Sequence, residues 1–150
     1  MVRKALVKDI KAIHSLIESF AIKGEMLHRT IVELHEQMRD FFVSADEDGE
    51  IVGVAALSLA WDGLGEVRSL SVKTSRTGSG IGTALTQACI EEARALGLKK
   101  IFALTYNVSF FEKNGFTPVD KEILPHKIWS DCVKCAKFPN CDENAVMMDL

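Results

Sequence analysis

The sequence predicts a mixed α/β fold (α+β in its sheet), with a mostly antiparallel sheet flanked by helices, in a single domain over residues 1–150. The chain has 150 residues, of which 47% are hydrophobic and 26% charged, as in an ordinary globular domain. It contains no repeat, low-complexity tract or linker. Its hydrophobic periodicity gives the order strand, two helices, three strands, helix, strand, helix, strand, which favours antiparallel pairing of consecutive strands. A cysteine-rich segment at about residues 124–150 ends the domain.

The first elements are a short strand and two helices. Val2 to Leu6 predicts the strand. Asp9 is expected to cap the helix that follows, because its carboxylate can accept the free N–H groups of a first turn. Apolar residues then recur at helical spacing until Gly24, where this helix is expected to end. Thr30 and Glu33 have the spacing of a capping box and predict the start of a second helix.

Three strands follow. Phe41 to Ala45 and Ile51 to Leu59 are joined by Asp48-Gly49, a strong signal for a hairpin turn. After a turn at Trp61 to Gly63, the segment Glu66 to Val72 alternates with a period of two, which predicts a strand with two different faces. The alternation assigns one face to Val67, Ser69 and Ser71, and the other to Arg68, Leu70 and Val72.

The second half of the chain contains the longest predicted helix. Gly78 to Gly82 forms a glycine-rich turn, and apolar residues at helical spacing then predict a helix that ends at Gly97. Lys100 to Tyr106 predicts a strand and Ser109 to Asn114 a short helix. Ala145 to Leu150 predicts the last strand.

Charge and hydropathy argue against several classes of partner. The net charge is -3 and no run of Lys and Arg is present, so a nucleic acid is not expected. The longest apolar run, Ile51 to Trp61, is shorter than the ~20 residues that cross a bilayer. Met1 to Ile10 lacks the apolar core of a signal peptide. We therefore expect a cytoplasmic protein with reduced cysteines and no membrane partner. Because the edge strands of such a sheet can pair with another copy, a homodimer is compatible with the sequence.

The glycine-rich turn is the sharpest functional signal. Thr77 to Gly82 reads Thr-Gly-Ser-Gly-Ile-Gly between a strand and the longest helix. Glycines let the backbone approach a ligand and point several N–H groups at one place, and the helix adds its positive N-terminal end. The spacing differs from the P-loop and from the dinucleotide fingerprint. The turn therefore predicts an anion site suited to a pyrophosphate, and the alternative is a flexible Gly/Ser turn.

Four segments in this order resemble the GNAT superfamily of acetyltransferases. They span about residues 2 to 120 and are Arg3 to Ala5, Leu70 to Val72, Thr77 to Gly82 and Phe110 to Phe116. The resemblance implies the mixed sheet of that family and an acetyl transfer to an amine. It also implies acetyl-CoA as the acetyl donor.

The resemblance further implies which residues bind the coenzyme. The backbone of Leu70 and Val72 would pair with its pantetheine arm and polarise the thioester carbonyl. Thr77 stands where the family usually has Gln or Arg, and Arg76 lies one place early, so the turn loses one charged contact but keeps its amides. The residues expected around the pyrophosphate are Thr77, Gly78, Ser79, Gly80, Ile81, Gly82 and Thr83.

A narrower resemblance suggests the base. Gly65 to Val72, Leu104-Thr105 and Leu124-Pro125-x-Lys127 resemble the acetyltransferase domain of N-acetylglutamate synthases, as does Leu27 to Arg29. On that resemblance, Glu66 is the catalytic residue that accepts the proton of the amine. The alternative for Glu66 is an ordinary carboxylate on the surface of a strand.

The usual acid of the family is missing. Many GNAT enzymes protonate the leaving thiolate with a tyrosine, whose position Phe111 occupies here. Tyr106, the single tyrosine of the chain, lies elsewhere in the sequence. Water or another residue would therefore have to donate this proton.

Glutamate carries two carboxylates, so an acceptor site for it needs cations. Arg29, Arg68 and Lys127 are the candidate substrate-binding residues, because Arg in particular matches a carboxylate with two parallel N–H groups. The alternative is solvated surface charge, and for Arg68 an ion pair with Glu66, two residues away on the same face. No amino-acid kinase-like domain, which accompanies many such synthases, occurs in this sequence, so feedback by arginine is not expected.

The cysteine-rich segment departs from both families. His126, Cys132, Cys135 and Cys141 could complete a tetrahedral zinc site, since Cys-x2-Cys has the spacing of metal ligands. Free thiols or a redox pair explain the same residues, so the metal stays unassigned. Cys89, on the apolar face of the longest helix, is expected in the core.

Three functions stay open on the sequence alone. The first is the synthesis of N-acetylglutamate for arginine biosynthesis. The second is acetylation of another amine or of a protein, although a pI of about 5.8 and the two arginines, Arg29 and Arg68, favour an anionic acceptor over a polyamine. The third is a non-catalytic acyl-CoA sensor, which Phe111 favours and Glu66 opposes.

Overall fold

A sheet of seven strands runs through the computed structural model, which describes residues 1–124 and 143–150. The order of its strands is β1-β2-β3-β4-β5-β7-β6. Every neighbouring pair is antiparallel except β4 and β5, which are parallel. The predicted mixed, mostly antiparallel sheet is therefore confirmed. The strands are β1 (Val2–Lys4), β2 (Phe41–Ala45), β3 (Ile51–Trp61), β4 (Leu64–Val72), β5 (Lys100–Thr105), β6 (Thr117–Val119) and β7 (Asn144–Asp149).

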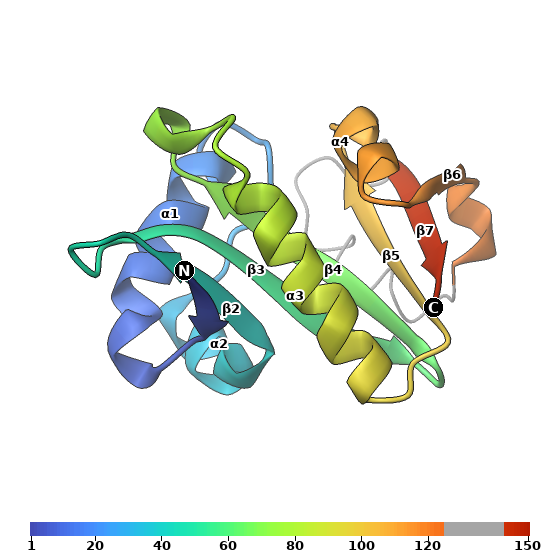
Figure 1. Ribbon diagram of the computed structural model, residues 1–150, viewed down its shortest axis with the longest axis horizontal. Coiled ribbons are helices and arrows are strands. Elements are labelled where there is room, and N and C mark those ends of the chain that lie inside the picture. The colour runs from blue at the N-terminus through green and yellow to red at the C-terminus, as the bar shows by residue number, and fades with distance from the viewer. Residues whose placement is uncertain (125–142) are drawn as a thin grey trace.

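Helices cover both faces of the sheet. Figure 1 shows α3 lying across β3 and β4 on one face, with α1 and α2 on the other. The alternation of β3 explains this arrangement, because Ala55 and Leu57 pack under α3, whereas Val54 and Ala56 pack against α1. The helices are α1 (Ile10–Ala21), α2 (Ile31–Gln37), α3 (Ile81–Ala95) and α4 (Val108–Lys113), with short 3-10 turns η1 (Val7–Asp9), η2 (Met38–Asp40), η3 (Thr74–Arg76) and η4 (Lys121–Ile123).

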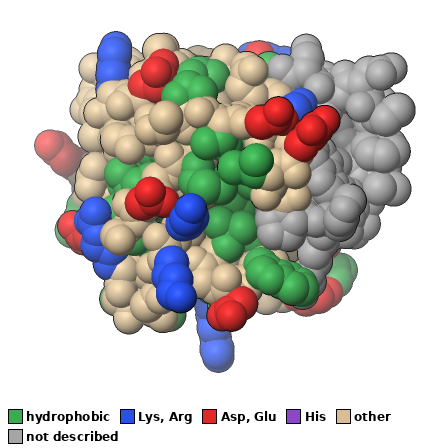
Figure 2. All heavy atoms as spheres, turned by 90° about the vertical axis from the view of Figure 1, so that its right-hand side faces the viewer, with side chains coloured by type: hydrophobic (Ala, Val, Ile, Leu, Met, Phe, Trp, Pro, Cys, Tyr) green, Lys and Arg blue, Asp and Glu red, His purple; other side chains and the backbone are tan. Residues whose placement is uncertain are grey.

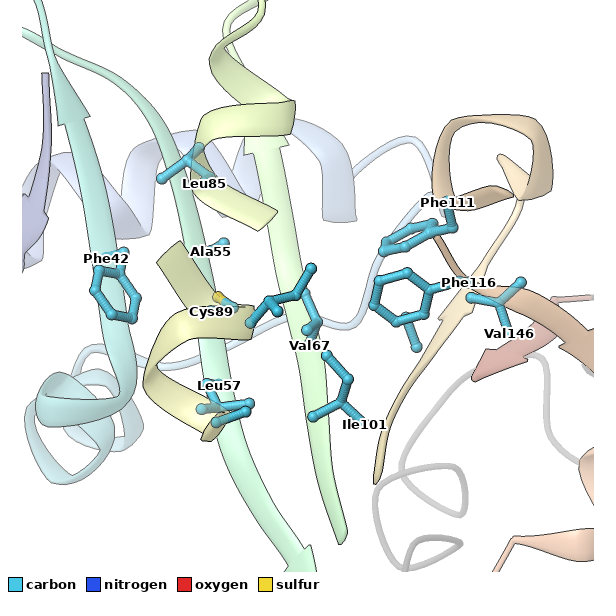
Figure 3. Close-up of a cluster of buried hydrophobic side chains, with 13 residues drawn as sticks. Phe42, Ala55, Leu57, Val67, Leu85, Cys89, Ile101, Phe111, Phe116 and Val146 are labelled. Atoms are coloured by element: carbon cyan, nitrogen blue, oxygen red, sulfur yellow. The ribbon is translucent and has the colours of Figure 1, made fainter. Parts of the chain in front are cut away.

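The larger core lies between α3 and the sheet. In Figure 3, Cys89 of α3 points toward β3 and β4, and Phe111 and Phe116 close the side of the core next to Val146. Cys89 is fully buried, as the sequence predicts, and burial raises the pKa of its thiol to about 12. The thiol is therefore a packing group and is not activated as a nucleophile.

One face of the molecule is mixed in charge. Figure 2 shows Lys and Arg side chains interspersed with Asp and Glu around a group of hydrophobic side chains. The described helices include none that is both long enough and apolar enough to cross a membrane.

Of the two predicted helix caps, the cap of α2 is confirmed and the cap of α1 is wrong. Thr30 accepts the N–H of Glu33 at 3.0 Å, and Glu33 accepts the N–H of Thr30 at 3.2 Å, so the capping box of α2 is formed. Asp9 makes no such bond to α1. Because the chain enters α1 through η1, the Asp9 carboxylate points back to the N–H of Leu6 at 2.8 Å and to the guanidinium of Arg3 at 2.7 Å.

Two features of the sheet differ from the expectations. A seventh strand, β6, pairs with β7 at the edge of the sheet, where the missing N–H of Pro118 costs little. The predicted alternation of β4 holds only as far as Arg68. Arg68 lies opposite Ala56 and Ser71 opposite Val54, so Ser69 and Leu70 share a single partner position in a β-bulge.

The bulge reverses the faces of β4 beyond it. Ser69 has a φ of 57°, in the left-handed region. Leu70 and Val72 consequently pack on the α3 side together with Val67, and Ser71 turns to the α1 side. The extra residue shifts the pleat by one position, which alternation in the sequence cannot reveal.

We predict that Asp9→Asn destabilises the protein in a pH-dependent way. The hydrogen bond from Arg3 lowers the pKa of Asp9 more than burial raises it, and the N–H of Leu6 lowers it further. A carboxylate whose pKa is lower in the folded state contributes stability that is complete above its unfolded pKa, about 3.9, and is lost as the pH falls through the folded pKa. The expected cost at pH 7 is about 1–3 kcal/mol of unfolding free energy.

Urea unfolding at pH 7 and at pH about 3 measures this difference. Asp48→Asn is the control, because Asp48 is exposed in the hairpin loop and the substitution should change stability by less than about 0.5 kcal/mol. An equal cost of Asp9→Asn at both pH values would contradict the assignment.

Candidate functional site

A cavity opens where β4 and β5 separate. The two strands pair only at Leu64 with Lys100, Gly65 with Ile101 and Glu66 with Phe102. Figure 1 shows them diverging from there, with β5 running toward α4 and β4 running away from it. A cavity of about 1040 Å³ lies in this opening and is lined by both strands. Its volume is at the upper end of the ~300–1,000 Å³ of small-molecule sites, so it has room for a large ligand.

Four parts of the fold supply the walls. They are the end of α1 with the loop after it, β4, the glycine-rich turn with the start of α3, and the end of β5 with α4. The described residues that line the cavity are Phe20, Ala21, Gly24, Glu25, Met26, Leu27, His28, Arg29, Glu66, Val67, Arg68, Ser69, Leu70, Val72, Arg76, Thr77, Gly78, Gly80, Ile81, Gly82, Thr83, Leu104, Thr105, Tyr106, Asn107, Phe110, Phe111 and Glu143.

The glycine-rich turn opens onto the cavity. Gly78 and Gly80 have φ values of 81° and 84°, and among the described residues no heavy atom beyond their chain neighbours lies within 4 Å of the place where a Cβ would stand. Gly80 is the N-cap of this 15-residue helix, and as a glycine it has no side chain that could cap the first N–H groups. The turn therefore presents backbone N–H groups and a helix N-terminus to the cavity, an arrangement suited to an anion.

The residues predicted for this anion site lie together, with one exception. Thr77, Gly78 and the segment 80–83 all line the cavity. Ser79 is not among the lining residues, and its hydroxyl donates to the carbonyl oxygen of Arg76. Thr77 likewise donates to Thr74 at 3.0 Å, so side chains within the turn hold its shape.

The peptide groups of β4 face the cavity past the bulge. The N–H of Lys73 donates to Val52 on β3 at 2.8 Å. Since peptide groups alternate along an extended strand, the N–H and C=O groups of Leu70 and Val72 point to the opposite edge, toward β5. The ladder between β4 and β5 has already ended there, so this edge can pair with an extended ligand.

Glu66 and Arg68 lie side by side on the wall. Their side chains are 14% and 15% exposed, and Arg68 Nη1 is 3.9 Å from Glu66 Oε1. The ion pair that the sequence left open as an alternative is therefore formed, and Glu66 is not a surface carboxylate. Burial raises the pKa of Asp40, and Arg68 acts in the opposite direction, which puts Arg68 within the field of two carboxyl groups.

Arg29 is buried in the loop after α1. It is only 5% exposed, and its Nη1 lies 3.7 Å from Glu33 Oε2. The alternative of a solvated surface charge is therefore wrong for Arg29. Side-chain contacts hold the loop in place: Ser71 donates to Met26 Sδ at 3.3 Å, and His28 Nδ1 lies 2.5 Å from Glu18 Oε2.

The aromatic corner of the cavity departs from the expectation for Tyr106. Phe111 packs edge-on against Phe110 and Phe116, with ring centroids 5.2 and 5.1 Å apart, and offers no proton. Tyr106, which the sequence places outside the recognised motifs, follows β5 directly and lines the cavity. Met26 and Phe20 were missed as well. Only the three-dimensional fold brings these residues to the site, and no local motif marks them.

Several predicted residues lie outside the described part of the chain. They are Lys127 and the candidate zinc ligands His126, Cys132, Cys135 and Cys141. Among residues 1–124 and 143–150, no three His, Cys, Asp or Glu side chains are grouped so as to hold a metal ion.

Known proteins with similar sequences match this chain over most of its length. The model of the Acetyltransferase (GNAT) family matches residues 8–116. An uncharacterized N-acetyltransferase of Chlorobaculum tepidum is 38% identical over 149 residues, which cover 99% of this chain and 96% of that protein. An amino-acid acetyltransferase of Mycobacterium tuberculosis is 37% identical over 92% of this chain and 83% of its own length.

Solved structures of other proteins have the same fold as this chain. Rv2747 from Mycobacterium tuberculosis, in complex with CoA and NLQ, matches with a TM-score of 0.85 and 29% identity over 100% of this chain and 99% of that one. N-acetylglutamate synthase from Neisseria gonorrhoeae, complexed with coenzyme A and N-acetyl-glutamate, matches with a TM-score of 0.89 and 26% identity, covering 100% of this chain and 35% of that one.

The bulge predicts opposite effects for two substitutions of Ser69. Glycine adopts the left-handed region without cost, so Ser69→Gly should keep or slightly raise stability. The β-branched Ser69→Val should lose about 1–2 kcal/mol relative to Ser69→Gly. Thermal unfolding measures both, with Ser58→Val in the regular part of β3 as a tolerated control. Equal stability of the glycine and valine variants would show that the bulge is not formed in solution.

Proposed function

The chain belongs to the GNAT family of acetyltransferases. We propose that it transfers the acetyl group of acetyl-CoA to the α-amine of an amino acid, and that its preferred acceptor is L-glutamate. One observation carries this proposal. A single cavity is bordered by the glycine-rich turn, by the open edge of β4, and by Glu66 and the buried Arg29.

The donor is proposed to lie along β4. The N–H groups of the turn from Thr77 to Thr83 would hold its pyrophosphate, and Gly78 and Gly80 leave space for the close approach. The peptide groups of Leu70 and Val72 would pair with the pantetheine arm as another strand does. Their N–H groups would polarise the thioester carbonyl at the point where β4 and β5 separate.

Glu66 is proposed as the general base. An amine enters as an ammonium ion and attacks only after losing a proton. Glu66 lies on the strand proposed to hold the thioester, and its carboxylate is largely shielded from solvent. It can therefore take the proton directly or through one water. Phe111 has no proton to give, so the leaving thiolate would take its proton from water or from another group of the cavity.

Arg29 and Arg68 are proposed to bind the carboxylates of the acceptor. Arg29 lines the cavity and is only 5% exposed, so its positive charge lies where it could meet an anionic acceptor out of solvent. Lys127 remains a predicted third cation. The names of the Mycobacterium tuberculosis and Neisseria gonorrhoeae relatives support an amino-acid acceptor, and glutamate would place the reaction in arginine biosynthesis in the cytoplasm.

A non-catalytic acyl-CoA sensor is the second candidate, and the apolar Phe111 favours it. Thiol release from acetyl-CoA across the twenty amino acids separates the two functions. Release specific to L-glutamate supports the proposal. Release with another amino acid alone would contradict glutamate as acceptor, and coenzyme binding without any release would support the sensor.

Glu66→Gln should lower kcat by about 10²–10⁴-fold, because the amide keeps the shape but cannot accept a proton. The affinity for CoA, measured by calorimetry, should stay within about two-fold, since the contacts proposed for the coenzyme are to backbone groups and not to this carboxylate. The rate loss should also shrink at high pH, where the amine enters deprotonated. A variant with normal kcat would remove Glu66 from the mechanism.

Arg29→Ala should raise the KM for the amino acid by about 10-fold or more, since a charged hydrogen bond contributes roughly 1.5–3 kcal/mol. Arg39→Ala is the matched control, because Arg39 does not line the cavity. The KM for acetyl-CoA should not change in either variant. An unchanged amino-acid KM in Arg29→Ala would exclude it from the acceptor site.

A further inference from the structure

Arg76 stands at the glycine-rich turn, but not at the position where the family carries its cation. It is the last residue of η3, directly before Thr77, and it is one of the residues that line the cavity. Its backbone is fixed, because its N–H donates to Lys73 at 2.8 Å and its carbonyl accepts the Ser79 hydroxyl. The guanidinium, in contrast, is 46% exposed.

The partner of Arg76 lies in the loop between β2 and β3. Asp46 Oδ2 accepts from Arg76 Nη2 at 3.2 Å. The other oxygen, Oδ1, accepts the N–H groups of Asp48 and Glu50, each at 2.9 Å. The two oxygens therefore have separate tasks: Oδ1 shapes the hairpin loop, and Oδ2 alone holds Arg76. If Arg76 moves, the hairpin loop keeps its own hydrogen bonds.

We propose that Arg76 contacts a phosphate of the coenzyme, supplying the charge that Thr77 lacks, and that Asp46 competes with that phosphate for it. This inference rests on the proposed function only in taking acetyl-CoA as the donor. The Asp46 side chain is 10% exposed but the Arg76 side chain is 46% exposed, so solvent reaches and weakens the ion pair. A guanidinium on a phosphate, in contrast, can make two charge-assisted hydrogen bonds. Once the coenzyme is bound, Arg76 therefore favours the phosphate over Asp46. Because the ion pair with Asp46 must first be broken, Asp46 lowers the affinity of the protein for the coenzyme.

Three substitutions separate this role from general electrostatics. Arg76→Gln removes the proposed contact. Lys73→Gln is the matched control, because it also removes one positive charge and one ion pair to the same hairpin, Lys73 to Glu50 at 2.7 Å, but Lys73 does not line the cavity. Asp46→Asn removes only the competitor, since the amide oxygen can keep the two hydrogen bonds of Oδ1.

Calorimetry with CoA measures all three without an acceptor. Arg76→Gln should weaken CoA about 10-fold, the lower end expected for a charged hydrogen bond. Lys73→Gln should change the affinity by less than about two-fold, because salt screens distant charges. Asp46→Asn should bind CoA about two- to five-fold more tightly. Equal losses in Arg76→Gln and Lys73→Gln, or weaker binding by Asp46→Asn, would overturn the inference.

A parallel titration with 3′-dephospho-CoA identifies the phosphate. If the 10-fold effect of Arg76→Gln persists, the contact is to the pyrophosphate, and if it disappears, the contact is to the 3′-phosphate; either result supports the inference. Failure of the unaltered protein to bind CoA would overturn the proposed function together with this inference. Normal CoA binding by both the unaltered protein and Arg76→Gln would overturn this inference alone.

Discussion

The short parallel contact between β4 and β5 determines the rest of the site. Three residue pairs join the strands, and tight packing anchors them there: a Cβ on Gly65 would come within 2.7 Å of Leu98 and 3.2 Å of Leu57, while Val67 and Ile101 are buried under α3. Had the pairing continued, β5 would have used the peptide groups of Leu70 and Val72 and closed the cavity. An incomplete ladder in the middle of the sheet is therefore what makes backbone available to a ligand.

The bulge at Ser69 divides β4 into two functional parts. Before it, Glu66 and Arg68 point to the side of α1, where the loop that carries Arg29 closes the cavity. After it, Leu70 and Val72 anchor the strand on the α3 core while their peptide groups face the opening. A regular strand would have placed Leu70 and Val72 on the face of Arg68. One residue in a left-handed conformation thus lets a single strand carry both the proposed base and the proposed thioester contact.

The sequence predicts the local elements well, since their signals are local. The capping box at Thr30, the turn at Gly78 to Gly82 and the periodicity of α3 depend on neighbours within one or two helical turns. The errors arise where a distant residue decides. Asp9 pairs with Arg3 of β1 instead of capping α1, and the burial of Arg29 and the approach of Tyr106 to the cavity depend on packing between remote segments. The order of the motifs in the sequence was enough to predict membership of the GNAT family. The roles of individual side chains depend on the three-dimensional packing around the cavity.

Amide hydrogen exchange of β4 with and without saturating CoA tests the central claim most directly. If the edge of β4 is open in the free protein and pairs with the coenzyme, the N–H groups of Leu70 and Val72 should exchange quickly alone and slow about 10-fold or more on binding. The N–H of Val43, inside the ladder of β2, should be slow in both states. Protection of Leu70 and Val72 in the free protein equal to that of Val43, or exchange that CoA leaves unchanged, would contradict the account.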